Sequence, residues 1–392
     1  MTKTVTGKSY YCSMKFKYLK IDLESNTTYN CHAAKSYPVD FKWLANNSGN
    51  LFNTDNNVND RAMMLRNERN SSCEQNCWAA EDVGAVSPRI YQGGSTVTHT
   101  DTRTHPEIID LTINGDCNLT CSYCCSEFSS SWRRDLISNG DYPLLDARYK
   151  ASIKDRALLK ISQPQLKATQ NYQTLLQEIG LAGPILKKLT ITGGEPFLDN
   201  ELVSTIQRLN LDKNTQVEIY TGLGVGYSRF ARLVEELETV NNLLIIVSAE
   251  SIGKYLEFNR YGSQWDDFIK KINLLKDHNI KMHFQSTITN LTIFGFVDFF
   301  NYFANDKIVT TFAYQPRMMA PYVLDPTSKE RICNDIETLP EQVKTMILNS
   351  IKETPTDAER TNISQFLTEF VNRRKDINLE IFPQSFLKWL EL

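Results

Sequence analysis

Three cysteines within one short segment could bind a reactive metal centre. Cys117, Cys121 and Cys124 stand in the spacing C-x3-C-x2-C. Soft thiolates at such short spacing favour an iron-sulfur cluster or zinc. Three protein ligands leave one coordination position open for a substrate or a cofactor, whereas a closed structural site uses four. The sequence therefore predicts a metal centre that takes part in chemistry.

A second motif accompanies the cysteines, and each motif follows a predicted strand. The cysteine segment comes after the apolar run 108–113, and the run 186–192 leads directly into Gly193-Gly194-Glu195-Pro196. Together the motifs resemble the radical S-adenosylmethionine (radical SAM) superfamily, in which C-x3-C-x2-C follows the first barrel strand and G-G-E-P the second. The resemblance implies a 4Fe-4S cluster on the three cysteines, with S-adenosylmethionine as its fourth ligand. It also implies reductive cleavage of that cofactor to a 5'-deoxyadenosyl radical, which abstracts hydrogen from a substrate.

The same resemblance assigns roles to neighbouring residues. Gly193 and Gly194 would let the backbone approach the methionine moiety, because glycine has no side chain. Glu195 would lie near the ammonium group of that moiety. Tyr123 matches an aromatic position that packs against adenine, and the alternative is a core aromatic.

A third group of candidates follows the predicted strand 243–249. Ser248 and Glu250 point to the same face, since strand side chains alternate, and the resemblance places polar contacts to the cofactor there. Many members of the superfamily carry Asp where Glu250 stands. Arg260 could bind the cofactor carboxylate as a fork donor, or it could be an exposed helix arginine.

The middle of the chain alternates predicted strands with segments of helical periodicity. We expect strands at 108–114, 186–192, 216–221, 243–249, 280–287 and 308–315, and helices at 201–209, 227–237, 265–277 and 293–303. This alternation predicts an α/β fold with a parallel sheet and helices outside it. Six units are too few for an eight-stranded barrel, and the resemblance implies a partial (β/α)6, TIM-like barrel. The loops at the carboxyl ends of its strands would build the site.

Three regions are expected along the chain. Residues 1–100 form an N-terminal domain, residues 101–320 the barrel, and residues 321–392 a helical C-terminal region. The barrel contains a long insertion at about 126–185, in which 144–161 and 166–179 have helical patterns. In the C-terminal region, helices are expected from Pro340 onward and at 363–370.

The N-terminal region holds four further cysteines, Cys12, Cys31, Cys73 and Cys77, near a predicted strand pair that begins at 18–23. Four thiolates could ligate an auxiliary 4Fe-4S cluster or a structural zinc, or they could be unliganded core thiols. The region resembles the twitch domain, the shorter relative of the SPASM domain, which carries a second cluster in many radical SAM enzymes.

The twitch-like region precedes the barrel here, whereas its usual place is after it. That arrangement, and the pattern Glu81-x2-Gly84-x2-Ser87-x-Arg89, resemble a group of radical SAM proteins that includes phage-encoded members. Cys125 directly follows the third predicted ligand and would point away from the cluster, so we expect that it is not a ligand. Cys333 has no partner motif, and buried free thiols are expected at both positions.

Composition limits the location and partners of the chain. Its 392 residues are 41% hydrophobic and 23% charged, with a formal net charge of -3. No apolar run approaches the roughly 20 residues of a membrane helix, and the first residues lack the apolar stretch of a signal peptide. We therefore expect a cytoplasmic protein, in the host cytoplasm if phage-encoded. Nothing in the charge pattern favours nucleic-acid or membrane binding.

The substrate is left open between a peptide, a sugar and a nucleotide. An electron donor such as flavodoxin or ferredoxin is implied by the resemblance. Gln285, Tyr314 and Gln315 could line the substrate pocket. The alternative to an enzyme is a non-catalytic redox or regulatory protein that binds iron-sulfur clusters and S-adenosylmethionine.

Overall fold

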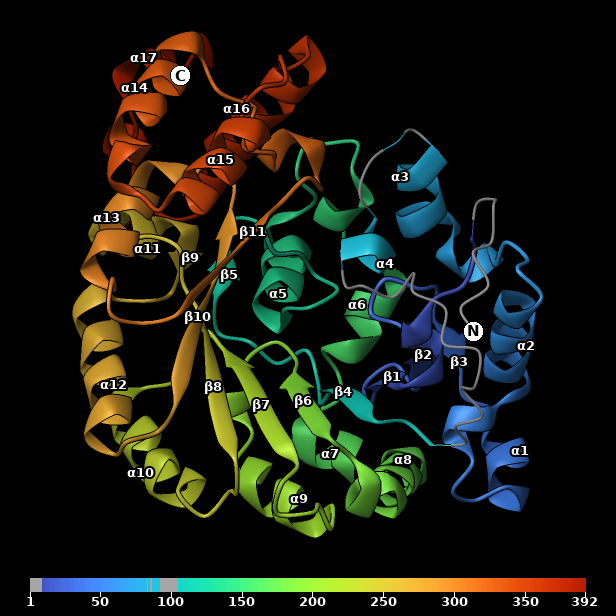
Figure 1. Cartoon of the computed structure of the whole chain (residues 1–392). Helices are drawn as coiled ribbons and strands as arrows, with labels where there is room; N and C mark the ends of the chain where they lie inside the picture. Colours follow the sequence, from blue (N-terminus) through green and yellow to red (C-terminus); the bar gives the residue numbers. More distant parts are fainter. Residues whose placement is uncertain (1–8, 83, 85–86, 92–104) are drawn as a thin grey trace.

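A nine-stranded sheet lies at the centre of the computed structural model, which describes residues 9–82, 84, 87–91 and 105–392 (Figure 1). From residue 105 onward, six of its strands run parallel to one another and follow one another in chain order. They are β4 (Ile108–Thr112), β6 (Lys188–Thr192), β7 (Gln216–Thr221), β8 (Leu243–Ser248), β10 (Met282–Ile288) and β11 (Ile308–Phe312). The predicted α/β fold with a parallel sheet is confirmed, and each predicted strand is present.

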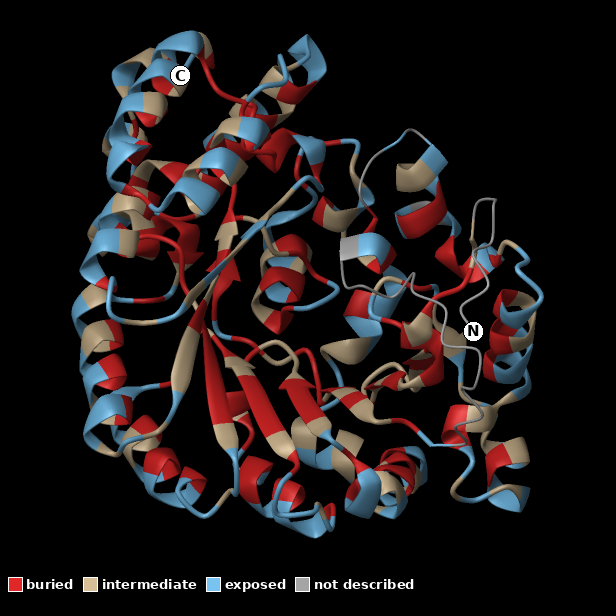
Figure 2. Ribbon diagram, in the orientation of Figure 1, coloured by how far each residue is buried: buried red, intermediate tan, exposed pale blue. Residues whose placement is uncertain are grey.

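The helices between these strands bury one face each. In α10 (Tyr227–Leu237), Phe230, Leu233, Val234 and Leu237 are buried, which is the spacing of an amphipathic helix. The helices α9 (Leu202–Arg208), α10, α12 (Trp265–Asp277) and α13 (Phe296–Tyr302) form an arc around the strands (Figure 1). The strands beneath them are largely buried, while the helices keep an exposed outer face (Figure 2). The four predicted helical segments are therefore confirmed.

The N-terminal strands extend the same sheet. β1 (Tyr18–Asp22) forms a hairpin with β2 (Thr27–Tyr29) and pairs in parallel with β4, so that Leu19 lies beside Ile109. The short β3 (Tyr37–Pro38) completes that edge. The predicted strand pair exists, but it is continuous with the sheet that we assigned to the barrel. The expected boundary between residues 100 and 101 lies outside the described residues.

The other elements described in the N-terminal region are helical and lie beside β1 to β3 (Figure 1). They include α1 (Phe41–Asn46), α2 (Asp55–Leu65), η3 (Ser71–Cys73), η4 (Glu74–Trp78), α3 (Ala79–Asp82) and α4 (Pro88–Tyr91). A small hydrophobic core, separate from the main one, includes Phe16, Met64 and Trp78 together with the four N-terminal cysteines.

The insertion folds differently from its predicted pattern. A single helix at 144–161 is wrong, because Ser152 and Asp155 form a capping box that starts the short α6 (Ile153–Leu158). The pattern at 166–179 corresponds to α7 (Gln163–Lys167) and α8 (Gln170–Ala182). No helix was expected at α5 (Ser130–Asn139), which the Ser129 side chain caps by accepting from the Trp132 amide.

The C-terminal region is helical, as predicted. It contains α14 (Pro326–Asp335), α15 (Glu341–Ser350), α16 (Asp357–Asn372) and α17 (Gln384–Trp389). The rings of Phe366 and Phe370 in α16 lie 6.4 and 6.1 Å from the ring of Trp132 in α5. No helix in the described part of the chain is long and apolar enough to cross a membrane.

Candidate metal centre and cofactor cavity

The segment with three cysteines runs from the carboxyl end of β4 to the start of α5. The amide of Cys117 donates to Ser130 Oγ at 3.1 Å, and Ser131 Oγ donates to the Cys117 carbonyl at 2.7 Å. Trp132 Nε1 donates to the Cys121 carbonyl at 3.0 Å. The first turn of α5 therefore holds the backbone of two of the three predicted ligands.

A two-stranded sheet fixes the other side of this segment. In it, β5 (Thr120–Cys121) pairs with β9 (Arg260–Tyr261), and Cys121 is the register partner of Arg260. The neighbouring Ser122 donates to the side chain of Asn259 at 2.8 Å. The pairing brings the end of α11 (Gly253–Asn259) against the cysteines, although about 140 residues separate the two segments in the chain.

The three cysteines line one cavity of about 190 Å³ at the carboxyl ends of β6, β7, β8 and β10. Most other predicted site residues line it too, namely Tyr123, Gly193, Gly194, Glu195, Ser248 and Arg260. The remaining lining residues were not among the predicted ones; they are Leu119, Phe128, Thr192, Tyr220, Thr221, Gly222 and Thr287. A usable signal was the threonine at or next to the end of β6, β7 and β10, where site residues of such sheets concentrate.

Glu250 and Arg260 are bound to each other. Arg260 Nε and Nη2 donate to the two carboxylate oxygens of Glu250 at 3.1 and 2.8 Å, and both side chains are buried. The Tyr123 hydroxyl lies 3.1 Å from both oxygens of the same carboxylate. Arg260 is therefore neither exposed nor a free fork donor, and the alternative of an exposed helix arginine is wrong. Burial alone would lower the pKa of the Arg260 guanidinium, but the neighbouring Glu250 carboxylate holds the pKa of Arg260 well above its ordinary value.

The two glycines of the second motif lie against the cysteine segment. A Cβ on Gly193 would be 2.6 Å from the Asn114 carbonyl oxygen, and one on Gly194 would be 2.4 Å from that of Asp116. The amide of Gly194 donates to the Asn114 carbonyl at 2.9 Å. Glycine is thus required here because the loop after β6 packs directly on the loop after β4.

The carboxylate of Glu195 binds donors from the loop after β7. It accepts from Thr221 Oγ1 at 2.6 Å, from the amides of Gly222 and Gly224 at 2.9 and 3.2 Å, and from the Phe197 amide at 3.1 Å. Burial raises the pKa of this carboxyl, and these hydrogen bonds partly offset the shift. Glu195 therefore ties the loop after β6 to the loop after β7.

The three thiols lie in a setting that suits a cluster of soft thiolate ligands. Burial raises the pKa of Cys117 to about 12 and that of Cys121 to about 11, and it holds the pKa of Cys124 well above its usual value. Arg260 opposes the shift at Cys121, because its Nη1 lies 3.9 Å from the sulfur. A bound metal would replace the thiol protons, and the guanidinium would then offset thiolate charge.

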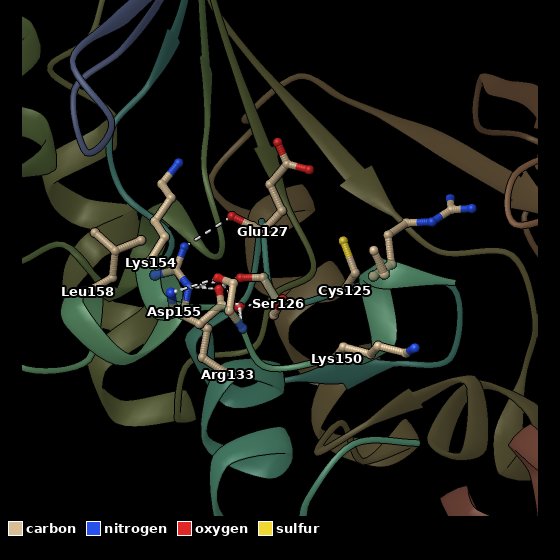
Figure 3. A pocket seen from close by; sticks show the side chains of 11 residues that line it. Cys125, Ser126, Glu127, Arg133, Lys150, Lys154, Asp155 and Leu158 are labelled. Carbon is tan, nitrogen blue, oxygen red and sulfur yellow. Dashed lines mark hydrogen bonds and ion pairs between the residues drawn. The ribbon is translucent and has the colours of Figure 1, made fainter. Parts of the chain in front are cut away.

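The adjacent Cys125 lines a different cavity, of about 330 Å³, with Arg133, Lys154 and Asp155 (Figure 3). Cys124 and Phe128 line the cavity of the predicted ligands, whereas Cys125, Ser126 and Glu127 between them line the other cavity. This position agrees with the expectation that Cys125 is not a ligand.

None of the three predicted substrate-pocket residues, Gln285, Tyr314 and Gln315, is among the residues that line the cysteine cavity. Gln285 donates to Thr311 Oγ1 at 3.0 Å on the neighbouring strand, and Tyr314 is 48% exposed. Gln315 lines a separate cavity of about 530 Å³ together with Arg317 and Glu359.

The four N-terminal cysteines come together although the chain separates them widely. Cys12, Cys31, Cys73 and Cys77 are all buried in the small N-terminal core. Burial raises the pKa of Cys12 to about 11 and that of Cys31 to about 12, and the neighbouring thiols add to both shifts. The cations Arg89 and Lys15 act in the opposite direction on Cys12 and Cys31 respectively.

Over the residues that the structure describes, no group of three or more Cys, His, Asp or Glu side chains is arranged to hold a metal ion as it stands. The fit of the two cysteine sets to iron-sulfur clusters therefore rests on other observations. These are the soft donor type, the meeting of each set in one buried pocket or core, and the cation beside each set.

The family comparison concerns the segment that contains both motifs. Residues 111–299 match the family model described as the Radical SAM superfamily. This segment, just under half of the chain, is therefore similar to the radical SAM superfamily. None of the curated proteins matches the chain.

Solved structures resemble part of the chain. Native anSMEcpe with bound AdoMet and the Cp18Cys peptide is 15% identical, with a TM-score of 0.36 over 58% of this chain and 57% of that one. Native anSMEcpe with bound AdoMet is 14% identical, with a TM-score of 0.31 over 52% of this chain and 50% of that one. Streptococcus suis SuiB bound to S-adenosylmethionine is 14% identical, with a TM-score of 0.32 over 75% of this chain and 61% of that one. The chain thus spans between about half and three fifths of the length of these structures.

Proposed function

From the similarity of residues 111–299 to the radical SAM superfamily, we propose that this chain is an enzyme that cleaves S-adenosylmethionine reductively and abstracts hydrogen from its substrate. The 4Fe-4S cluster would be held by Cys117, Cys121 and Cys124. The observation that carries the proposal is the single cavity that joins these thiols to Gly193, Gly194 and Ser248 at the carboxyl ends of the parallel strands.

Bound cluster and cofactor together would supply the electron transfer and the radical, and the chain's own residues would set their geometry. The start of α5 fixes the backbone of Cys117 and Cys121. Glu195 positions the loop after β7 at the edge of the cavity. The buried Arg260 would offset thiolate charge at Cys121 while Glu250 keeps its guanidinium in place. The resemblance would further place Tyr123 beside adenine and Ser248 beside the polar part of the cofactor.

We also propose that the parallel strands form a partial (β/α)6 barrel and that the N-terminal cysteines hold an auxiliary 4Fe-4S cluster, as in a twitch-like domain. Support comes from the meeting of Cys12, Cys31, Cys73 and Cys77 in one buried core. Structural zinc is the alternative ligand of four thiolates. A peptide, sugar or nucleotide substrate, a flavodoxin or ferredoxin as electron donor, and a cytoplasmic location, with or without phage origin, remain part of this proposal.

Anaerobic reconstitution with iron and sulfide tests the enzyme. We expect about eight irons in the wild type, four in each cluster, and production of 5'-deoxyadenosine from S-adenosylmethionine and a reductant. The variant Cys117→Ala/Cys121→Ala/Cys124→Ala should keep about four irons and make no deoxyadenosine. Cys125→Ala is the matched control, since this neighbouring thiol lines the other cavity, and it should behave as the wild type.

A fully loaded wild type that makes no deoxyadenosine would contradict the enzyme and favour a non-catalytic redox or regulatory protein. About four irons in the wild type, with zinc also bound, would contradict the auxiliary cluster alone.

A further inference from the structure

Two buried ion pairs lie among the N-terminal cysteines. Lys15 is fully buried, and its Nζ lies 2.9 Å from Asp60 Oδ2. Arg89 and Glu81 have side chains that are each 5% exposed, and Arg89 Nη2 lies 2.6 Å from Glu81 Oε2. Buried ion pairs rarely add stability over apolar residues of the same size, because desolvation offsets their attraction. Their presence in so small a core calls for another role.

The first pair binds residues that flank three of the cysteines. Lys15, three residues after Cys12, donates to Ser72 Oγ at 2.6 Å and to Asn30 Oδ1. Asp60 accepts from Asn30 Nδ2 at 2.6 Å, and its Oδ2 lies 2.9 Å from Ser72 Oγ. Asn30 directly precedes Cys31, and Ser72 directly precedes Cys73. One ion pair on α2 and η1 (Ser13–Phe16) thus ties together three separate cysteine segments.

The second pair contacts the segment of the fourth cysteine, Cys77, and again the segment of Cys12. Arg89 Nη1 donates to the carbonyl of Tyr11, which directly precedes Cys12, at 2.7 Å. Its guanidinium also lies 5.0 Å from the ring centroid of Trp78, which directly follows Cys77. Glu81 accepts from Arg89 Nε at 3.0 Å and from Ser87 Oγ at 2.6 Å. These contacts account for Glu81, Ser87 and Arg89 of the sequence pattern noted above.

We propose that Lys15–Asp60 and Arg89–Glu81 are positioning residues of a four-thiolate iron-sulfur centre, and that the two cations offset its negative charge. The inference rests on the auxiliary cluster proposed above. Four thiolates bring four negative charges into a buried core, and such charge is tolerated only beside a counter-charge. Hydrogen bonds and charge around a cluster also set its reduction potential. Each carboxylate holds its cation in place and itself acts on the potential in the opposite direction.

The test uses the full chain with Cys117→Ala/Cys121→Ala/Cys124→Ala, so that only the N-terminal centre can hold iron. Iron content and the midpoint potential, followed by electron paramagnetic resonance, are measured with and without further substitutions. Lys15→Met should lower the potential, because a positive charge is lost. Asp60→Asn should raise it, because a negative charge is lost while the shape is kept. The double variant Lys15→Met/Asp60→Asn should return close to the parent value.

The second pair provides variants that do not depend on the folding of Lys15→Met. Glu81→Gln should raise the potential. Arg89→Lys should restore the potential that Arg89→Gln lowers, although it loses the bond to Tyr11. Arg66→Gln is the matched control, since Arg66 forms an exposed ion pair with Glu68 in the same region and should leave the potential unchanged.

Two different failures can be told apart. A parent variant without iron would overturn the auxiliary cluster, and the role of the ion pairs with it. Two results in a parent that holds a cluster would overturn the role of the ion pairs alone. One is a midpoint potential that neither Asp60→Asn nor Glu81→Gln changes. The other is a potential that shifts in the same direction whether the cation or the carboxylate of a pair is neutralised.

Discussion

Arg260 Nη1 lies 3.9 Å from the sulfur of Cys121, and the backbone pairing of β5 with β9 places the two residues in register. A bidentate ion pair with Glu250 keeps the guanidinium there, and the Glu250 carboxylate also accepts a hydrogen bond from the hydroxyl of Tyr123. A predicted ligand and three predicted cofactor residues therefore form one connected unit before any cofactor binds.

Loss of the Glu250 charge should destabilise this unit strongly. Glu250→Gln leaves Arg260 buried without its charged partner, which costs about 3–5 kcal/mol of unfolding free energy. Denaturation of the reduced, iron-free protein measures the change. Tyr123→Phe removes only a hydrogen bond and should cost about 1 kcal/mol. Equal losses of unfolding free energy in the two variants would show that the ion pair contributes no more to stability than a single hydrogen bond.

A methyl group on Gly194 should disrupt the first metal centre. Its Cβ would lie 2.4 Å from the Asp116 carbonyl oxygen, and backbone cannot move away as a flexible side chain can. We expect Gly194→Ala to lose most of the iron of this centre, measured after reconstitution, while the N-terminal centre is retained.

The matched glycine control is Gly226→Ala. Nothing lies within 4 Å of its added Cβ, and as the residue before α10 it should lose at most about 1 kcal/mol. Normal iron content in Gly194→Ala would mean that the loops after β4 and β6 can separate without cost to the centre.

Glu195 should act through the loop after β7. Because the amides of Gly222 and Gly224 donate to its Oε2 and the Phe197 amide donates to its Oε1, the single carbonyl oxygen of the side chain in Glu195→Gln can accept from only one of these two sets. Faster amide hydrogen exchange at the two glycines or at Phe197 in the iron-free protein is the expected result. Glu201→Gln, which changes an exposed carboxylate bound to Lys167, is the control. Unchanged exchange would contradict the positioning role of Glu195.

The strands and both motifs could be predicted because their signals are local. Each strand is a short apolar run, such as Leu243 to Ser248, and each motif directly follows one of them. The ends of parallel strands meet at one edge, so the common cavity followed from the order of the elements. Among the predicted residues, Glu250 lies beyond the end of β8, where it binds Arg260 and does not line the described cavity.

The rest depended on contacts between distant segments. The parallel pairing of β1 with β4 joins residues about 90 positions apart, and neither strand specifies its partner. The first turn of α5 is rich in serine, which favours helix caps but lowers interior helix propensity. The partner of Arg260 could not be deduced either, because it requires the β5–β9 pairing that follows from the complete fold.

The C-terminal helices should confer an acid-sensitive contribution to stability through Glu359. This residue caps the first turn of α16 by accepting from the Thr356 amide at 2.8 Å, and it also binds Arg317 Nε at 2.6 Å and the Tyr322 hydroxyl at 2.8 Å. Burial alone would raise the pKa of Glu359, but these contacts lower it below 4.5. Because the folded state holds the proton less tightly than the unfolded state, the stabilisation is present above pH 4.5 and is lost as the pH falls through the folded pKa.

Melting temperatures of the iron-free protein across this pH range measure that contribution. Glu359→Gln should melt well below the wild type at pH 7, and the difference should shrink as the pH falls below about 4.5, where the wild-type carboxylate also becomes neutral. Glu353→Gln, an exposed neighbour 3.7 Å from Arg317, should melt like the wild type throughout. A difference for Glu359→Gln that stays constant with pH would assign the loss to altered packing, since only the charged carboxylate can produce the convergence.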